Sequence, residues 1–381
     1  MPPKSKKRKV ESSQQEKGKS GSSSKIPCDL ARLGAQEVAS NAQKGLLPLP
    51  AELKLEIFDN FLIIGPFTET PGNDYPVLPI AYLERTDTLR ALSQVCVAYR
   101  REFLPVLWET FNACCAARPS SGSNPNNFFK HIGETLLLKS KGVSVNPTLG
   151  AFIRTANIVL TRYQTETVIP KFSKSLRKLP NLHTLHVLHA HTQMTTAIKT
   201  GFEGVELPSI RTLIIPGYCH EILQRCPNVT IVWCIRDDGS KLITVIAKHC
   251  KAVEEMRGFS GEESIMKRIA KAAPNLRVFD MWDHTYEAVL ERLPSFKKFN
   301  TLIVKTPQAP DSDTIHVNRW GVQTKPSPPR PDLQKCISDA KARFKKLPPT
   351  NERRRIRIFH QDTTAKKGFR SLGQYREVDL E

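Results

Sequence analysis

The sequence predicts an α+β fold, with a short helical module near its amino end followed by a longer region in which strands and helices alternate. Three observations predict it. Apolar residues recur at helical spacing between residues 47 and 108, and a short Pro-polar-apolar motif recurs between about residues 150 and 305. The first residues are rich in Ser, Lys and Gly, have almost nothing to bury, and are therefore expected to be disordered.

Changes in composition along the 381 residues divide the chain into six predicted segments. They are a disordered basic tail (1–44), a helical module (45–117) with an insertion (64–86), a linker (118–149), a repeat region (150–305), a proline-rich linker (306–331) and a basic helix with a tail (332–381). In the last segment, residues 333–347 place apolar residues on one helical face, and Ile356-Arg357-Ile358 alternates like a short strand. We expect that basic helix to cover the open end of the repeat region. A second import signal or a site for an acidic partner around Arg353-Arg354-Arg355 is the alternative.

The first helix of the module is predicted to start at Pro50, because the first turn of a helix tolerates the missing N–H of proline. Leu53, Ile57 and Phe61 then recur every four residues and form one apolar stripe. A second helix, capped by Thr86 or Asp87 and ended by Pro105, is predicted from apolar residues at three- and four-residue steps: Leu89, Leu92, Val95, Cys96, Tyr99 and Phe103.

The order of these features resembles an F-box, the helical module that docks a substrate receptor onto the Skp-type adaptor of a cullin–RING ubiquitin ligase. The resemblance rests on Leu49-Pro50-Ala51-Glu52-Leu53, Ile57, Val95-Cys96 followed by Tyr99-Arg100, and Leu107-Trp108. It implies a Skp-type adaptor and a cullin scaffold as partners, with adaptor contacts at Leu49, Pro50, Leu53, Ile57, Leu89, Leu92 and Val95. The proline-rich stretch from Ile64 to Arg85 departs from the family pattern and leaves open which later residues face the adaptor. An ordinary helical hairpin is the alternative.

The Pro-polar-apolar motif is clearest in four places. These are Leu179-Pro180-Asn181-Leu182, Leu207-Pro208-Ser209-Ile210, Cys226-Pro227-Asn228-Val229 and Ala273-Pro274-Asn275-Leu276. With weaker copies, the equivalent positions are Ile153, Leu182, Ile210, Val229, Val253, Leu276 and Phe299, at intervals of 29, 28, 19, 24, 23 and 23 residues. Such periods are typical of leucine-rich repeats, in which a strand is followed by a returning helix. The region therefore resembles an irregular α/β leucine-rich-repeat solenoid, and its pairing with an F-box is similar to many fungal F-box proteins.

Alternation along the predicted strands separates inward from outward residues. Leu185 and Val187, Val232 and Cys234, Met256 and Gly258, and Phe279 and Met281 are predicted to point inward. One outward row is then Trp233, Arg257, Asp280 and Ile303, and the next is Ile235, Phe259, Trp282 and Lys305. Because Trp and Arg dominate interface energetics, we predict a protein substrate to contact Trp233, Arg257, Phe259, Asp280 and Trp282. A strand phase shifted by one residue, or loops that cover these rings, is the alternative.

The net charge of +20 is concentrated at the two ends of the chain, since residues 1–30 and 305–381 together supply 13 of the 20 charges. This distribution makes a nucleic-acid-binding groove less expected than basic tails. Within the first tail, Lys6, Lys7, Arg8 and Lys9 follow Pro3 and match a nuclear localisation signal. The sequence thus predicts binding to an import receptor and location in the nucleus, with the cytoplasm as a second location.

The cysteines and histidines do not form patterns typical of catalysis or metal binding. The nine cysteines include no C-x-x-C pair and suggest reduced, mostly buried thiols. His183, His186, His189 and His191 crowd together without a carboxylate or cysteine at ligand spacing and are interpreted as surface residues. The adjacent Cys114 and Cys115, expected at a helix end, lack a nearby histidine. No cofactor and no catalytic residue are predicted. No apolar run approaches the roughly 20 residues that cross a bilayer, so no membrane contact is expected.

These expectations combine into one predicted function, that of a non-catalytic receptor subunit. The helical module would bind the adaptor, and the repeat region would bind a protein substrate whose lysines receive ubiquitin from partner enzymes. Two other functions stay open. One is a nuclear repeat scaffold that does not bind an adaptor, and the other is a basic nucleic-acid-binding protein.

Overall fold

The structure is a computed structural model that describes most of the chain from residue 48 onward. The described residues are 48–65, 68, 70, 76–117, 127–282, 286–306, 316–317, 323–324, 331–347, 353–361 and 372–379. The predicted disordered tail, with its nuclear localisation signal at Lys6, Lys7, Arg8 and Lys9, lies outside these residues. Both remain predictions from the sequence.

Three helices open the described part of the chain: α2 (Ala51–Asp59), α3 (Glu84–Val95) and α4 (Val97–Trp108), with the short 3-10 helix η1 (Ile80–Leu83) before α3. The single helix that the sequence predicts across Cys96 is in fact two helices, because Cys96 has an extended backbone with φ −158° and ψ 174°. Pro105 does not end the second one, contrary to expectation. Phe103 and its neighbours Val106 and Leu107 pack in one apolar cluster, which holds the last turn despite the N–H that proline lacks.

The centre of the molecule is a mixed α/β assembly built on one ten-stranded sheet. Its strands are β1 (Thr110–Ala113), β2 (Thr155–Val159), β3 (Thr184–His189), β4 (Thr212–Ile215), β5 (Ile231–Cys234), β6 (Glu255–Arg257), β7 (Val278–Trp282), β8 (Thr301–Thr306), β11 (Arg355–Gln361) and β12 (Leu372–Asp379). They lie side by side in chain order. Every neighbouring pair is parallel except β11 and β12, which are antiparallel. Two short strands, β9 (His316–Val317) and β10 (Gln323–Thr324), pair separately.

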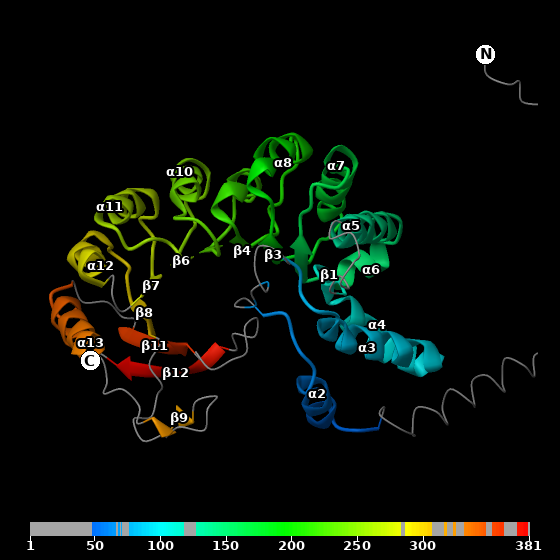
Figure 1. Ribbon diagram of the computed structural model, residues 1–381, viewed down its shortest axis with the longest axis horizontal. Coiled ribbons are helices and arrows are strands. Elements are labelled where there is room, and N and C mark those ends of the chain that lie inside the picture. The colour runs from blue at the N-terminus through cyan, green and yellow to red at the C-terminus, as the bar shows by residue number, and fades with distance from the viewer. Residues whose placement is uncertain are drawn as a thin grey trace, which may run out of the picture.

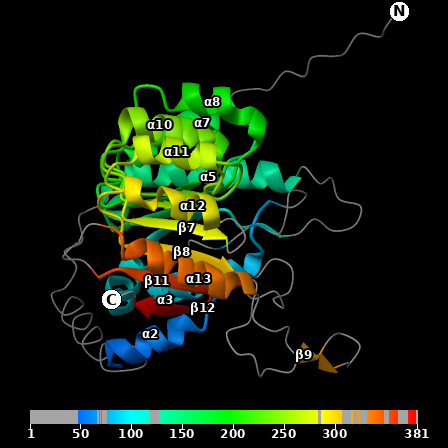
Figure 2. The same ribbon diagram turned by 90° about the vertical axis from the view of Figure 1, so that its left-hand side faces the viewer.

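Helices between the strands cover the outer side of this curved sheet (Figure 1). They are α5 (Asn127–Val145), α6 (Pro147–Phe152), α7 (Thr165–Leu176), α8 (Thr195–Gly201), α9 (His220–Leu223), α10 (Ser240–His249), α11 (Glu263–Ala272) and α12 (Tyr286–Arg292), with 3-10 turns η2 (Thr192–Met194), η3 (Gly217–Cys219) and η4 (Leu293–Ser295). Viewed from the side, α10, α11, α12 and then α13 (Pro331–Phe344) follow one another in tiers (Figure 2). We call the side of the sheet that faces away from these helices the inner face.

The Pro-polar-apolar motif marks the strand starts in the structure. Each of the seven predicted positions is buried and lies two residues before a strand, from Ile153 before β2 to Phe299 before β8. The asparagine of the motif has a role that the sequence did not reveal. Asn181 Nδ2 donates to the carbonyl of Ala151 over 2.6 Å, and Asn275 Nδ2 donates to that of Lys251 over 3.1 Å. These asparagines therefore tie one strand-and-helix unit to the unit before it.

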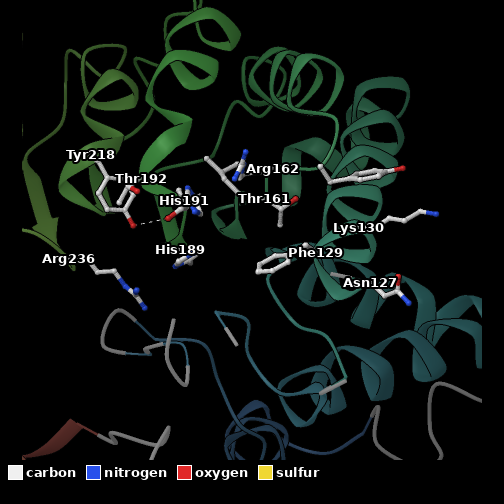
Figure 3. Close-up of a pocket in the computed structure, with 13 residues that line it drawn as sticks. Asn127, Phe129, Lys130, Thr161, Arg162, His189, His191, Thr192, Tyr218 and Arg236 are labelled. Carbon is white, nitrogen blue, oxygen red and sulfur yellow. Dashed lines mark hydrogen bonds between the residues drawn. The ribbon is translucent and has the colours of Figure 1, made fainter. Parts of the chain in front are cut away.

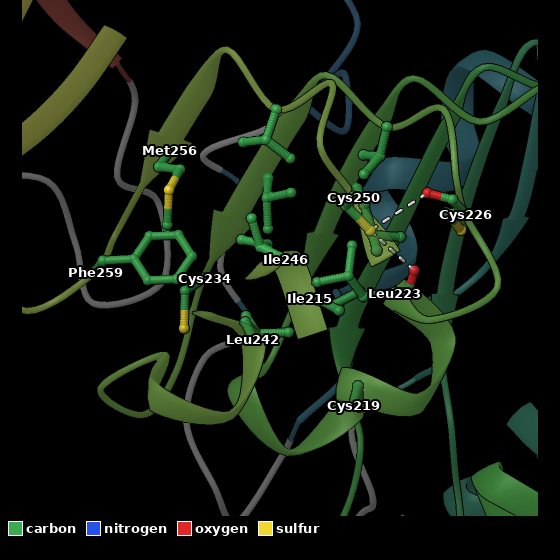
Figure 4. Packing of buried hydrophobic residues seen from close by; sticks show 14 of the residues in the cluster. Ile215, Cys219, Leu223, Cys226, Cys234, Leu242, Ile246, Cys250, Met256 and Phe259 are labelled. Carbon is green, nitrogen blue, oxygen red and sulfur yellow. Dashed lines mark hydrogen bonds between the residues drawn. The ribbon is translucent and has the colours of Figure 1, made fainter. Parts of the chain in front are cut away.

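The apolar core lies between the sheet and the outer helices (Figure 4). The thiol of Cys250 fits there by donating to the carbonyls of Leu223 and Cys226, both 3.6 Å away. Burial raises the pKa of Cys250 to about 11 and that of Cys234 to about 12. These thiols stay protonated at neutral pH, which confirms the prediction of buried thiols for the described cysteines other than the half-buried Cys96.

Part of the insertion at 64–86 packs against the inner face of the sheet. Val77 and Leu78 are fully buried in a cluster with Val159 of β2 and Leu188 of β3. The amide of Leu78 donates to the carbonyl of Cys114 over 2.8 Å, so this segment extends the pairing just past β1. Farther along the sheet, Arg236 Nη2 donates to the hydroxyl of the buried Thr70 over 3.0 Å. The described part of the insertion thus covers the inner face at β2 and β3 and reaches Arg236 after β5.

Two predicted boundaries were wrong. The described part of the predicted linker, residues 127–149, is not a linker, because α5 buries one helical face that includes Ile132 and Leu136. The sheet also begins inside the predicted helical module, at β1, and Cys114 and Cys115 follow that strand rather than a helix. At the other end, α13 and β11 confirm the predicted helix and strand, and β11 and β12 extend the sheet beyond residue 305. The proline-rich linker lies largely outside the described residues.

Candidate functional site

The first candidate site is an apolar face on α2. Leu53 is 46 % exposed and Ile57 is 40 % exposed. Because residues four apart lie above one another on a helix, the two side chains share one face. Pro50 directly precedes the helix, with φ −52° and ψ 150°. The face therefore lies near the start of the described chain. We call Leu53 and Ile57 the α2 face.

A different side of α2 holds the helix to the protein. Phe58 is buried, with its ring centroid 6.0 Å from that of Phe103 in α4. The guanidinium carbon of Arg85 lies 5.8 Å from the Phe58 ring, and Lys54 Nζ lies 2.9 Å from a carboxylate oxygen of Glu102. These contacts anchor α2 while Leu53 and Ile57 stay exposed. The helix therefore has two apolar sides, and one of them is partly exposed in the described part of the chain.

The other predicted adaptor contacts divide into accessible and buried residues. Pro50 is exposed, Leu49 is half-buried, and Val95 is well exposed at the end of α3. Leu89 is 1 % exposed and packs with Phe58 and Phe103, so it is a core residue and cannot contact an adaptor. Leu92 is half-buried against the same cluster. Sequence periodicity placed Leu89 and Leu92 correctly on one side of α3. It could not tell how much of that side the protein itself covers.

Three exposed apolar residues of this module, Ile63, Ile80 and Val97, were not singled out by the sequence analysis, whereas the exposed Leu62 continues the predicted apolar stripe. Ile63 follows α2, Ile80 begins η1 and Val97 begins α4. A run of apolar residues continuing past the end of a helix was the available signal for Ile63. Val97 could not be found, because its position depends on the break at Cys96.

The second candidate site is the row of side chains on the inner face. Strand register places Trp233 opposite Arg257 and Asp280 opposite Ile303, as the sequence predicted. The predicted inward residues, such as Val232, are in the core. The strand phase is therefore confirmed for these strands.

Most of the residues predicted to bind substrate are, however, engaged within the protein. Trp233 and Asp280 are buried, and the guanidinium carbon of Arg257 lies 4.9 Å from the Trp233 ring centroid. Asp280 Oδ1 accepts from the amide of Gly258 over 2.5 Å, and its other oxygen forms an ion pair with Lys305. These residues stabilise the inner face and are not a free patch, which corrects the sequence-based assignment. Trp282 is in register with Lys305, but its side chain lies outside what the structure describes.

Phe259 was assigned to the wrong side of the sheet. Strand β6 ends at Arg257, and Gly258 follows with φ +71°. This left-handed conformation interrupts the alternation, so the Phe259 ring turns into the core. A pattern of alternating residues cannot reveal such a reversal, because it depends on the backbone conformation of a single glycine.

The four histidines do not form one group. His183 and His191 are exposed, as predicted, whereas His186 is 1 % exposed in the inner-face row. Burial alone lowers the pKa of His186 to about 3. Burial, with smaller effects of the nearby Arg236 and His191, lowers the pKa of His189 to about 4. Both rings are neutral at pH 7, and within the described ranges no three His, Cys, Asp or Glu residues gather as metal ligands would.

Among the described helices, none combines the length and the apolar character that crossing a membrane requires. No protein-family model matches the sequence, and no curated protein sequence matches it. One solved structure with a resembling arrangement is the crystal structure of a protein from Bacteroides fragilis, a structural-genomics target. It shares 12 % sequence identity and a TM-score of 0.35, over 73 % of this chain and 76 % of that chain. At this TM-score the likeness carries no argument about the fold or the function of the present chain.

Proposed function

We propose that this chain is a substrate-recognition subunit of an SCF-type cullin–RING ubiquitin ligase, in which the α2 face binds a Skp-type adaptor. The observation that carries the proposal is that Leu53 and Ile57 are exposed on a helix that Phe58 anchors by another side. Fully burying an exposed leucine or isoleucine side chain contributes about 1.5–3 kcal/mol, and covering the exposed part of Leu53 and Ile57 would contribute a corresponding share. This exposed face on the anchored helix α2 therefore favours a partner over water.

The order of the helices supports the same proposal. The resemblance to an F-box rests on a first helix that begins at Leu-Pro-x-Glu-Leu and on two later helices that close on Leu107-Trp108, and α2, α3 and α4 occupy these positions. The insertion between α2 and α3 leaves the α2 face accessible, because its described part packs on the inner face of the sheet. The departure from the family pattern is thus compatible with adaptor binding.

We further infer that the ten-stranded part is an irregular leucine-rich-repeat solenoid that holds the protein substrate. Its support is the Pro-polar-apolar motif, whose equivalent position precedes seven consecutive strands by two residues, together with strands in chain order and helices on one side. In this proposal the chain performs no chemistry. It would hold the lysines of a substrate close to the ubiquitin-carrying partner enzyme, and proximity alone would accelerate the transfer.

Binding of the purified full chain to a purified Skp-type adaptor tests the proposal. Leu53→Asp combined with Ile57→Asp should weaken the affinity at least about 100-fold, because two anchoring contacts are replaced by desolvated charges. Both side chains are more than a third exposed, so the melting temperature should fall only slightly. Leu138→Asp is the matched control, since Leu138 is also an exposed leucine and lies on the distant helix α5.

Two results would contradict the proposal. One is that the unaltered chain fails to bind adaptor at about 100 μM, which is weak even for a transient interface. The other is that the double variant binds as tightly as the Leu138→Asp control. Leu89→Ala would be a poor test, because Leu89 is a core residue and its loss would destabilise the helices themselves.

A further inference from the structure

A cavity of about 1010 Å³ lies where four neighbouring strands end (Figure 3). Its walls come from the loops after β2, β3, β4 and β5, and from the first turn of α5. The carboxyl ends of parallel strands are a common place for ligands, because successive loops converge there while the strands keep them rigid. The cavity is separate from the α2 face, so a ligand bound in it would not depend on adaptor binding.

The charged side chains that line this cavity are all basic. Lys130 comes from α5, Arg162 follows β2, and Arg236 follows β5, whereas no aspartate or glutamate among the described residues lines the cavity. A carboxylate close to this wall is that of Glu134, which lies 3.9 Å from Lys130 Nζ and accepts from the Tyr163 hydroxyl over 3.2 Å. The positive end of the α5 dipole lies at the same wall and adds to the field. This combination favours an anionic ligand.

Two polar atoms at the cavity wall have no hydrogen-bond partner in the described protein. Thr161 is only 7 % exposed, and its Oγ1 is buried without a partner. The same holds for Nδ1 of His189. A buried hydroxyl without a partner is costly, so native proteins usually pair such groups with protein, water or a ligand. The Tyr218 hydroxyl, in contrast, is already fixed, because it donates to the carbonyl of Ala190 over 2.8 Å.

Aromatic rings complete the lining. Phe129 lies at the cavity beside Lys130, and Tyr163 and Tyr218 contribute two more rings. Burial raises the pKa of Tyr218 to about 12, so this phenol adds no negative charge at neutral pH. Ligand cavities are typically on the order of 300–1,000 Å³, with a mostly apolar wall and a few polar groups that fix orientation. The cavity is therefore large enough for an organic molecule with one ring system and one charged group.

We infer that this cavity binds an organic phosphate monoester, with the phosphate beside Arg162 and the Thr161 hydroxyl and with a planar group against Phe129. Lys130 and Arg236 lie at opposite ends of the cavity (Figure 3) and add to its positive field. Three cations suit a dianionic phosphate better than a single carboxylate, and a neutral threonine hydroxyl can donate to a phosphate oxygen. The same chemistry is carried by a free aromatic phosphate and by a phosphorylated residue of another protein.

Calorimetric titration of the full chain tests the inference, with phenyl phosphate, adenosine monophosphate and a short phosphotyrosine peptide as probes. Phenol and inorganic phosphate serve as the two half-ligand controls. We expect phenyl phosphate or the nucleotide to bind at least about tenfold more tightly than either half-ligand, because both parts of the site contribute. Tighter binding of the peptide than of the free phosphates would identify the source as a phosphorylated protein, and the reverse order would identify a small molecule.

The variant Thr161→Val separates a ligand-binding role from a structural one. Valine has nearly the shape of threonine and lacks the hydroxyl that no described protein atom pairs with. Affinity for the phosphate probe should fall roughly tenfold, the effect of losing one hydrogen bond to a charged group. The melting temperature of the free protein should stay the same or rise. A merely structural hydroxyl would give the opposite pattern, with lower stability and unchanged affinity.

Arg162→Gln should likewise weaken binding roughly tenfold, and it leaves packing intact because Arg162 is exposed. Lys141→Gln is the matched control, since Lys141 is an exposed cation on α5 that does not line the cavity. The inference is overturned if no organic phosphate shows saturable binding up to about 10 mM, well above ordinary ligand affinities. It is equally overturned if phenol binds as well as phenyl phosphate, or if Arg162→Gln behaves like the Lys141→Gln control.

Discussion

At the scale of single residues, His186 is the clearest case in which burial decides chemistry. The ring is enclosed in the inner-face row between Asn157 on β2 and Ile214 on β4, its neighbours in the strand register. Burial disfavours the charged imidazolium, which is why its pKa falls to about 3. The unfolded chain, with an ordinary histidine pKa of about 6.5, takes up a proton at a pH where the folded chain does not.

Stability should therefore fall as the pH is lowered. Between about pH 6.5 and about pH 3 the unfolded state binds the proton and the folded state does not, so each pH unit costs on the order of 1.4 kcal/mol for His186. Above about pH 6.5 the ring is neutral in both states and contributes no pH dependence. His189 acts in the same direction over a narrower range, because its folded-state pKa is about 4.

Urea unfolding at about pH 7.5 and about pH 5 measures this effect. The variant His186→Gln, which cannot titrate, should lose on the order of 2 kcal/mol less stability between these two pH values than the unaltered chain. His183→Gln is the control, because His183 is exposed. Equal pH dependence in all three proteins would show that His186 is not kept neutral by burial.

At the scale of elements, the end of β6 shows how one backbone conformation redirects a segment. Gly258 has φ +71°, and a Cβ at this position would lie 1.9 Å from the carbonyl oxygen of Cys234. The glycine therefore allows β6 to approach β5 closely, lets its amide donate to Asp280 and turns Phe259 into the core. The end of β6, the position of Asp280 and the packing of Phe259 in the core therefore all require glycine at position 258.

Gly258→Ala should lower the free energy of unfolding by on the order of 2–4 kcal/mol, because the clash is with backbone and the conformation is strained for any other residue. Gly142→Ala is the matched control. Gly142 lies inside α5 with nothing within 4 Å of the added Cβ, so alanine should raise stability by about 0.5–1 kcal/mol through its better helix propensity. Chemical denaturation of both variants measures the difference, and a mild effect at Gly258 would refute the close approach.

At the scale of the whole molecule, the sheet continues past the last strand of the repeat region. Beyond β8, the parallel strand β11 and the antiparallel strand β12 continue the hydrogen bonding, and α13 covers the core beside them (Figure 1). Phe344 of α13 is fully buried, with its ring centroid 5.7 Å from that of Phe299. A sheet that stopped at β8 would expose a long edge and an aromatic cluster, which favours association between copies.

Phe344→Ala should lower the free energy of unfolding by about 3–5 kcal/mol, the usual cost of removing a buried phenylalanine. We also expect this variant to associate on warming, because loosening α13 uncovers the β8–β11 end of the sheet. Denaturation curves and light scattering during a thermal ramp measure the two effects. Arg343→Ala, at an exposed position on the same helix, should change neither, and a soluble, fully stable Phe344→Ala protein would show that α13 does not close the sheet.

The candidate α2 face was largely predictable from sequence, whereas the cavity was not. Leu53 and Ile57 belong to a single helix, so a period of about four residues suffices to place them together. The cavity combines the start of α5 with loops after four strands, and α5 lies in a segment that the sequence assigned to a linker. Residues that meet only through several strand crossovers leave no periodic signal.

The sequence by itself determined where the seven strands from β2 to β8 begin, which side chains of those strands enter the core between strands and helices, and that a helix and a strand follow the proline-rich segment. These features depend on local periodicity and on a repeated motif, which act over a few residues. Only the tertiary structure decided that Leu89 is buried, that Trp233 and Asp280 are paired within the protein, and that Val77 and Leu78 cover part of the inner face. The physical reason is that burial depends on which distant segments pack together, and no pattern within one element records it.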